Sequence, residues 1–111
     1  MINIYYLDDE PALCEVFKMV FSSDEINITT FTEAEDAITA CFSAEPDAIF
    51  IDFRLADTTG DVVAEKLSDT LVKYLVTGDL VNTTTYQFKE TITKPFDIPY
   101  IQSLLNELIT N

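Results

Sequence analysis

Four short segments of this sequence end in side chains that could do chemistry together. Asp8 and Asp9 follow one apolar run, Asp52 follows a second, and Thr77 and Lys94 follow two more. Three carboxylates within a few ångströms of one another would repel by on the order of 4 kcal/mol per pair at an effective dielectric constant near 20, so they would need a cation. If these side chains meet, we expect a divalent cation site.

The types of these side chains indicate which cation and which reaction. Oxygen ligands without His or Cys suit Mg²⁺, which takes one or two carboxylates, keeps several waters and leaves room for phosphate oxygens. The ammonium group of Lys94 and the hydroxyl group of Thr77 suit the oxygens of a phosphoryl group in transfer. The remaining carboxylate could then attack phosphorus. The pattern therefore predicts phosphoryl transfer with Mg²⁺.

These side chains can meet only if the elements before them form one sheet. β-Branched and apolar runs predict five strands, at residues 2–7, 27–31, 48–51, 71–76 and 90–93. Helical patterns between the strands predict an α/β fold, a doubly wound parallel sheet with helices on both faces. Ligands of such sheets bind beyond the carboxyl ends of the strands, where the five side chains are expected. Without repeats or linkers, residues 1–111 are expected to form a single domain.

Apolar residues at three- and four-residue spacing predict the helices. The first begins at Pro11 and has a stripe that includes Val16 and Val20, and the last is capped by Asp97. Thr32, three residues before Glu35, forms a capping-box pattern for another, whose stripe ends at Phe42. A short helix follows Gly60. Threonines in the segment 79–89 favour strand over helix, so the fourth helix should be short or irregular.

Composition excludes several functions. The chain has 20 Asp and Glu residues against six Lys and Arg, a net charge of −14 and no His. A His-based acid or base, a His-containing zinc site and a Ser/His/Asp triad are therefore excluded, and direct nucleic-acid binding is not expected. Cys14 and Cys41 are predicted to be buried, reduced thiols. Without a transmembrane run or a signal-peptide pattern, we expect a cytoplasmic protein that does not bind membranes.

The sequence resembles the response-regulator receiver domain of two-component signalling over essentially its whole length. The resemblance rests on Leu-Asp-Asp-Glu at 7–10, Ile-Asp-Phe-Arg-Leu at 51–55 with Gly60, Val-Thr-Gly at 76–78 and Thr-Lys-Pro-Phe at 93–96. Each motif is weak alone, but the four together, in the family's order, are highly specific. The resemblance implies a flavodoxin-like sheet with the strand order 2-1-3-4-5.

The resemblance also implies a role for each site residue. It makes Asp52 the phosphoacceptor and implies that Thr77 and Lys94 bind the phosphoryl oxygens. The implied Mg²⁺ ligands are Asp9, Asp52 and the main-chain carbonyl of Arg54, with Asp8 acting through water. The bond between Lys94 and Pro95 is expected to be cis, as it usually is in the family.

The implied function is that of a signalling switch. A sensor histidine kinase or a histidine phosphotransfer protein would supply the phosphoryl group from a phosphohistidine, and an unidentified downstream protein would read the resulting aspartyl phosphate. Such a protein modifies itself and then loses the phosphate at the same site, so we do not expect an enzyme with turnover on a metabolite. The identity of the kinase, the input signal and the output stay open.

Two features depart from the family pattern. Ala56 stands where the family often has Pro, and Thr91 stands where it usually has a switch aromatic, three residues before the lysine. Thr91 is too small for that role, and the segment from Thr77 to Lys94 is short. The output face is therefore expected to be altered.

Two alternative functions stay open. A phosphorylation-independent pseudo-receiver, an interaction module with the same fold, is supported by Thr91 and the short fourth segment. A phosphohydrolase of the haloacid dehalogenase type also uses an aspartate and Mg²⁺, but its first strand should end in Asp-x-Asp, whereas Asp8 and Asp9 are adjacent.

Overall fold

The chain forms a five-stranded sheet flanked by helices. The computed structural model describes residues 1–78 and 85–110. In chain order the elements are β1 (Ile2–Leu7), α1 (Pro11–Phe21), β2 (Ile26–Phe31), α2 (Ala34–Ser43), β3 (Ala48–Asp52), α3 (Gly60–Glu65), β4 (Val72–Thr77), β5 (Glu90–Thr93) and α4 (Ile98–Thr110). All neighbouring strands are parallel and lie in the order β2-β1-β3-β4-β5. The predicted flavodoxin-like fold is confirmed.

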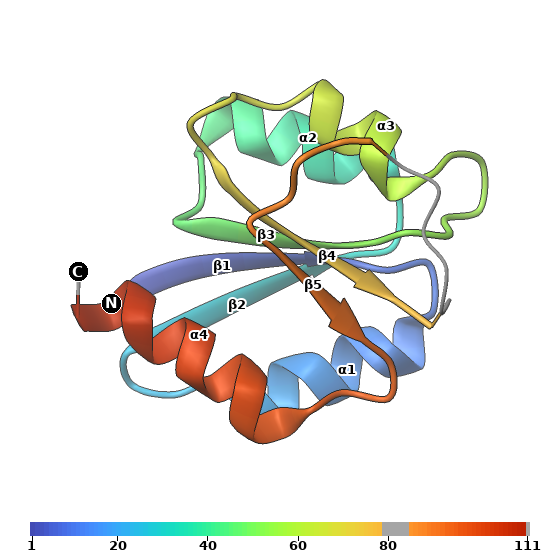
Figure 1. The fold of residues 1–111 in the computed structure, drawn as a ribbon. Coiled ribbons are helices and arrows are strands. Elements are labelled where there is room, and N and C mark those ends of the chain that lie inside the picture. Colours follow the sequence, from blue (N-terminus) through green and yellow to red (C-terminus); the bar gives the residue numbers. More distant parts are fainter. Residues whose placement is uncertain (79–84, 111) are drawn as a thin grey trace.

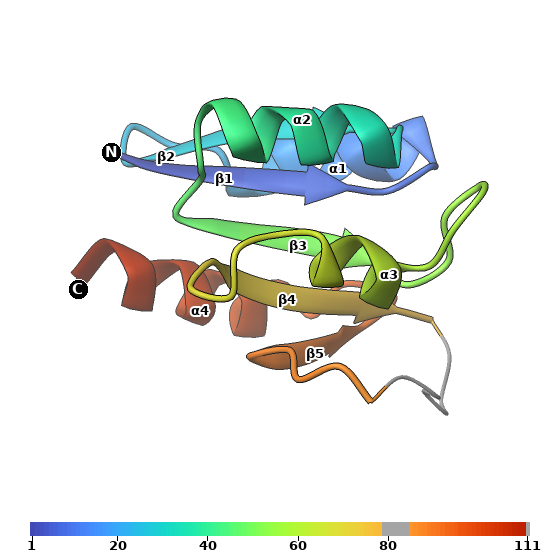
Figure 2. The same ribbon diagram turned by 90° about the horizontal axis from the view of Figure 1, so that it is seen from above.

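The helices cover both faces of the sheet. Figures 1 and 2 show α1 and α4 on one face and α2 and α3 on the other. Because successive side chains of a strand point to opposite faces, β1 sends Tyr6 into the core under α1 and α4, and Leu7 into the core under α2 and α3. All five residues of the central strand β3 are buried. This central position brings Asp52, the last residue of β3, between two core layers.

The helices bury narrower stripes than their sequences predict. Val16 and Val20 of α1 are 44% and 40% exposed, and Phe42 of α2 is 72% exposed. In the described part of the chain no second layer covers the outer side of either helix, so only the residues facing the sheet are buried. The predicted capping box at Thr32 is also wrong. The N-cap residue of α2 is Glu33, one residue later, and it makes no side-chain capping bond. The cap at Asp97 is confirmed by its bond from the amide of Tyr100.

The link between β4 and β5 lacks a helix in its described part. The predicted fourth helical segment, 79–89, lies partly outside the described residues, and residues 85–89 are not helical. The amide of Lys89 donates to the carbonyl of Lys73, and Tyr86 and Phe88 pack on the core under α2 and α3. Among the residues that the structure describes, no helix has the length and apolarity needed to cross a bilayer.

Candidate functional site

Strand register brings the predicted site residues to one edge of the sheet. Leu7 pairs with Ile51, so Asp8 and Asp52 emerge side by side from adjacent strands. On the other side of β3, Thr77 at the end of β4 pairs with Thr93 at the end of β5. Lys94 therefore follows β5 beside the end of β4. The four chain segments therefore end together, at the carboxyl edge of the parallel sheet, as the strand order requires.

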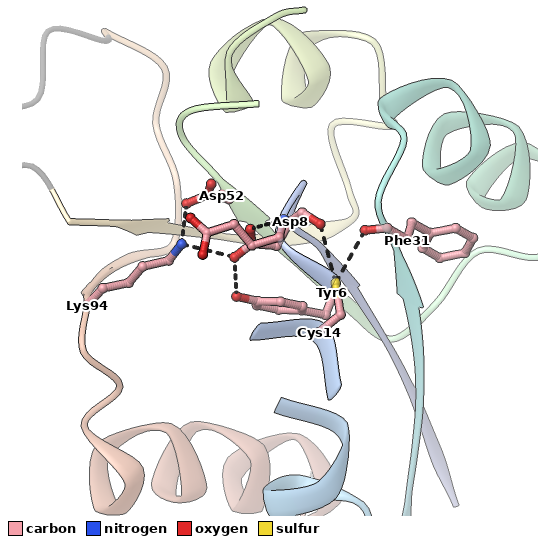
Figure 3. A network of polar contacts seen from close by, with 7 residues as sticks. Tyr6, Asp8, Cys14, Phe31, Asp52 and Lys94 are labelled. Carbon is pink, nitrogen blue, oxygen red and sulfur yellow. Dashed lines mark hydrogen bonds and ion pairs between the residues drawn. The ribbon is translucent and has the colours of Figure 1, made fainter. Parts of the chain in front are cut away.

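Three carboxylates and one ammonium group form the centre of the site. Asp8, Asp9 and Asp52 each place one carboxylate oxygen within 4.8 Å of those of the other two. The Nζ atom of Lys94 lies 2.9 Å from Oδ2 of Asp8 and 3.0 Å from Oδ1 of Asp52, so the lysine bridges two of the acids (Figure 3). The acids outnumber the ammonium group, and the site keeps an excess of negative charge.

A cleft of about 370 Å³ opens onto this cluster. Its walls are formed by Asp9, Glu10, Asp52, Arg54, Thr77, Gly78 and Lys94. Five of the six predicted site residues thus line one cleft. The sixth, Asp8, is fully buried and does not line it.

Burial and charge shift the pKa values at this edge. Burial raises the pKa of Asp52 to about 6; the hydrogen bond from Lys94 opposes this shift, and the negative charges of Asp8 and Asp9 add to it. Burial lowers the pKa of Lys94, but its hydrogen bonds to Asp8 and Asp52 outweigh that effect and leave the pKa above its ordinary value. Lys94 is therefore a fixed positive charge.

Asp8 also has partners that sequence analysis missed. The hydroxyl of Tyr6 donates to Oδ2 of Asp8 at 2.7 Å, and the amide of Glu10 donates to Oδ1 at 3.0 Å (Figure 3). The thiol of Cys14 donates to the main-chain carbonyl of Asp8 at 3.3 Å. The spacing of Tyr6 and Asp8 could have predicted this contact, because residues two apart in a strand point to the same face.

Tyr6 and Cys14 are buried beside Asp8, and their ionised forms are disfavoured. Burial, followed by the charge of Asp8, holds the pKa of Tyr6 far above its usual range. Burial likewise raises the pKa of Cys14 to about 11. Cys14 and Cys41 are both buried and free, as predicted. Tyr6 therefore acts as a neutral hydrogen-bond donor at the site.

The loop after β3 fixes the position of Asp52 and of the Arg54 main chain. The amide of Phe53 donates to the carbonyl of Val76, and the amide of Gly60 donates to the carbonyl of Phe53. Arg54 forms an isolated antiparallel bridge with Thr59. These bonds return the chain to α3 close to the strand end, so that Arg54 lines the cleft beside Asp52.

The loop after β5 holds Lys94 in place. The amide of Lys94 donates to the carbonyl of Thr77 at 2.9 Å, and the Lys94–Pro95 bond is cis, as predicted. Thr91 lies three residues before the lysine and is exposed. No aromatic ring therefore occupies the position where the family usually has its switch residue.

The donor set fits Mg²⁺. Hard cations of this kind prefer oxygen ligands, and the three acids at the ends of β1 and β3 provide carboxylate oxygens within one small volume. Lys94 now neutralises part of this charge, because it lies between Asp8 and Asp52. The acid cluster is thus consistent with a magnesium site.

Residues 4–106 match the response regulator receiver domain family. The chain is also 30% identical over 116 residues to a probable transcriptional regulatory protein, TcrX, of Mycobacterium tuberculosis. That match covers 97% of this chain and 50% of TcrX, so the chain spans about half the length of this relative.

Solved structures with the same fold include three receivers. A CheY-like receiver domain of Methylobacillus flagellatus superposes with a TM-score of 0.85 at 24% identity, covering 97% of this chain and 98% of that one. The response regulator TrrA of Thermotoga maritima, in complex with Mg²⁺ and BeF, gives a TM-score of 0.86 at 22% identity, covering 97% and 99%. The receiver domain of a Pseudomonas aeruginosa sensor histidine kinase, with a magnesium ion in its active-site cleft, gives 0.86 at 18% identity, covering 99% and 98%.

The sequence match and the geometry agree. The matched residues include every strand end that contributes to the cleft, and the acids, the hydroxyl and the ammonium group stand in the order that the motifs predict. Receiver domains work with histidine kinases and are not classical enzymes. The chain therefore belongs to the response regulator receiver domain family.

Proposed function

We propose that residues 1–111 form a single receiver domain that accepts a phosphoryl group on Asp52 and works as a signalling switch. The donor is the phosphohistidine of a sensor histidine kinase or of a histidine phosphotransfer protein. The observation that supports this proposal most is the cleft at which Asp52 lies beside an ammonium group and close to two further acids.

In the proposed reaction, a carboxylate oxygen of Asp52 attacks phosphorus. A phosphorus–oxygen bond forms while the bond from phosphorus to the histidine nitrogen breaks, and that nitrogen keeps the bonding electron pair. The product is an acyl phosphate, from which water later releases phosphate. Lys94 and Thr77 both line the cleft and can hold the phosphoryl oxygens during transfer.

The proposed metal ligands are Asp9, Asp52 and the main-chain carbonyl of Arg54, with Asp8 acting through water. Bound Mg²⁺ would neutralise the charge that accumulates between the acids and the phosphoryl oxygens. Lys94 would then leave Asp52 and turn its ammonium group toward the phosphoryl group. The free, buried thiols of Cys14 and Cys41 support a reducing, cytoplasmic location.

A pseudo-receiver remains the second candidate. The exposed Thr91 and the non-helical residues 85–89 support it, because both depart from the usual output side of the family. Such a module would bind its partner without phosphate. A haloacid dehalogenase activity gains no support from the receiver match, although multiple turnovers on a simple phosphomonoester would favour it.

Intact-mass analysis tests the proposal. The protein is incubated with Mg²⁺ and a small phosphodonor such as acetyl phosphate, beside an Asp52→Asn variant. The expected result is a mass increase of one phosphoryl group in the wild type and none in Asp52→Asn. Absence of any adduct on the wild type would favour the pseudo-receiver, and an unchanged adduct on Asp52→Asn would place the phosphate elsewhere.

A further inference from the structure

Asp8 is held by three donors, and one of them is shared with a second acid. Tyr6 and Lys94 both donate to Oδ2, and the amide of Glu10 donates to Oδ1. The amide is fixed by the main chain. Lys94, by contrast, also bridges to Asp52, so its ammonium group is shared between two acids.

The ring of Tyr6 is fixed by packing. It is fully buried, stacks on Phe17 with ring centroids 4.2 Å apart and an interplanar angle of 11°, and meets the edge of Phe96 at 6.0 Å. Its hydroxyl therefore reaches Asp8 from the core under α1 and α4 (Figure 3). A donor locked in this way keeps the carboxylate of Asp8 in one orientation.

Tyr6 and Lys94 differ in what each of them bonds besides Asp8. A phosphoryl group that draws the ammonium of Lys94 away would leave the buried Asp8 with one donor fewer. Within residues 1–78 and 85–110, the Tyr6 hydroxyl donates only to Asp8. It can therefore hold the acid while Lys94 moves.

We propose that Tyr6 is a positioning residue that orients Asp8 for Mg²⁺ through the bond from its hydroxyl to Oδ2. This inference rests on the proposed function, because it assigns Asp8 to the magnesium site. Partners that orient metal-binding side chains typically change metal affinity by 10- to 100-fold when they are removed. The hydroxyl also withdraws some negative charge from Asp8, which weakens it as a ligand. Without the hydroxyl, however, the orientation of the Asp8 side chain would depend on Lys94, which is shared with Asp52.

Calorimetric titration with MgCl₂ at constant ionic strength tests the proposal. Tyr6→Phe keeps the ring and its stacking on Phe17, and it should raise the Mg²⁺ dissociation constant about tenfold. Tyr74→Phe is the matched control: Tyr74 is also fully buried and stacks on Phe50 at 4.7 Å, but its hydroxyl makes no bond to Asp8, Asp9 or Asp52. Its Mg²⁺ dissociation constant should equal that of the wild type.

A second pair of variants separates positioning from a general loss of packing. In an Asp8→Asn background, adding Tyr6→Phe should no longer change Mg²⁺ affinity, because the acid through which the hydroxyl acts is gone. An unchanged or tighter constant in Tyr6→Phe, an equal loss in Tyr74→Phe, or the same tenfold loss in the Asp8→Asn background would each overturn the proposal. If Asp8→Asn does not fold, the comparison of Tyr6→Phe with Tyr74→Phe decides alone.

The two proposals fail separately. If wild-type protein takes up phosphate on Asp52 while Tyr6→Phe binds Mg²⁺ normally, only the role of Tyr6 is wrong. If wild-type protein binds Mg²⁺ but takes up no phosphate, the phosphoacceptor function is wrong, and the titration still reports on Tyr6.

Discussion

A carboxylate that attacks phosphorus has to be ionised, and the surroundings of Asp52 oppose ionisation. Its side chain is only 8% exposed, and burial raises its pKa to about 6 from 3.8, against the hydrogen bond from Lys94 and with help from Asp8 and Asp9. A cation that enters the cluster would favour the ionised form. Under the proposed function, a bound metal would therefore prepare Asp52 as the nucleophile as well as hold the phosphate.

This raised pKa makes the stability of the metal-free protein depend on pH. Below about pH 4, Asp52 is protonated in both the folded and the unfolded state. Between about pH 4 and pH 6, only the folded state keeps the proton. The free energy of unfolding therefore falls as the pH rises through this window. The loss from this one group is on the order of 3 kcal/mol. Urea unfolding in EDTA should show the wild type losing stability relative to Asp52→Asn as the pH rises. A difference that does not change with pH would contradict this assignment.

Tyr74 offers a second test at the level of one residue. Its hydroxyl is buried and has no hydrogen-bond partner among the described residues. Burial raises its pKa to about 12, with further contributions from Glu107, Glu90 and Tyr100. A buried polar group without a partner lowers stability by about 1–3 kcal/mol. Tyr74→Phe should therefore raise the free energy of unfolding by about 1 kcal/mol, measured by urea denaturation. Destabilisation would indicate that the hydroxyl has a partner in solution.

Among the elements, the link between β4 and β5 departs most from the expected alternation. Residues 85–89 cover the α3 side of the sheet with two aromatic rings, those of Tyr86 and Phe88, whose centroids are 4.8 Å apart. Beneath them the buried Lys73 donates to the carbonyls of Ser68 and Leu71 and lies 5.7 Å from the Tyr86 ring centroid. In residues 85–89, the part of this link that the structure describes, aromatic rings pack over a buried lysine without a helix.

The junction of β3 and α3 leaves no room for a side chain at Gly60. A Cβ atom at this position would lie 2.6 Å from the main-chain oxygen of Asp52 and 3.0 Å from Cγ2 of Ile51. Gly60→Ala should therefore lower the free energy of unfolding by about 1–3 kcal/mol, because a central strand has to shift. Chemical denaturation measures the change.

Gly78→Ala is the control for this steric argument. Among the residues that the structure describes, its Cβ atom would meet nothing closer than the Cβ atom of Lys94, at 4.0 Å, and neither glycine has a positive φ angle. Stability should stay within about 0.5 kcal/mol of the wild type. Equal stability of the two variants would show that α3 does not approach Asp52 so closely.

The whole molecule has a net charge of −14, so any cation will stabilise it to some extent. Specific binding should add to this effect: Mg²⁺ at about a hundred times its dissociation constant contributes roughly 2.7 kcal/mol, a rise in melting temperature on the order of 10 °C. Thermal unfolding with MgCl₂ and with NaCl at matched ionic strength separates the two. Asp9→Ala should lose the specific part, and an equal rise in both proteins would count against the site.

Much of the fold and of the candidate site follows from local sequence patterns. Alternating runs predict a parallel sheet, and in such a sheet the residues after each strand have to share an edge; this places Asp8, Asp52, Thr77 and Lys94 together before any contact is known. The width of the buried face of each helix was less predictable. Val16 and Phe42 continue helical stripes in sequence, yet they are exposed, because periodicity does not tell how wide a face the sheet covers.

The amino-acid sequence was sufficient to predict the parallel sheet and the acids at its edge, because strand and helix periods and turn residues are local properties of the chain. The family and the strand order followed from the resemblance of its four motifs to receiver domains. The bond from Tyr6 to Asp8 and the bridge that Lys94 makes from Asp8 to Asp52 emerged only from the folded chain. Residues 8 and 94 are brought together by register across the sheet, and hydrogen-bond partners depend on side-chain directions that no sequence period encodes.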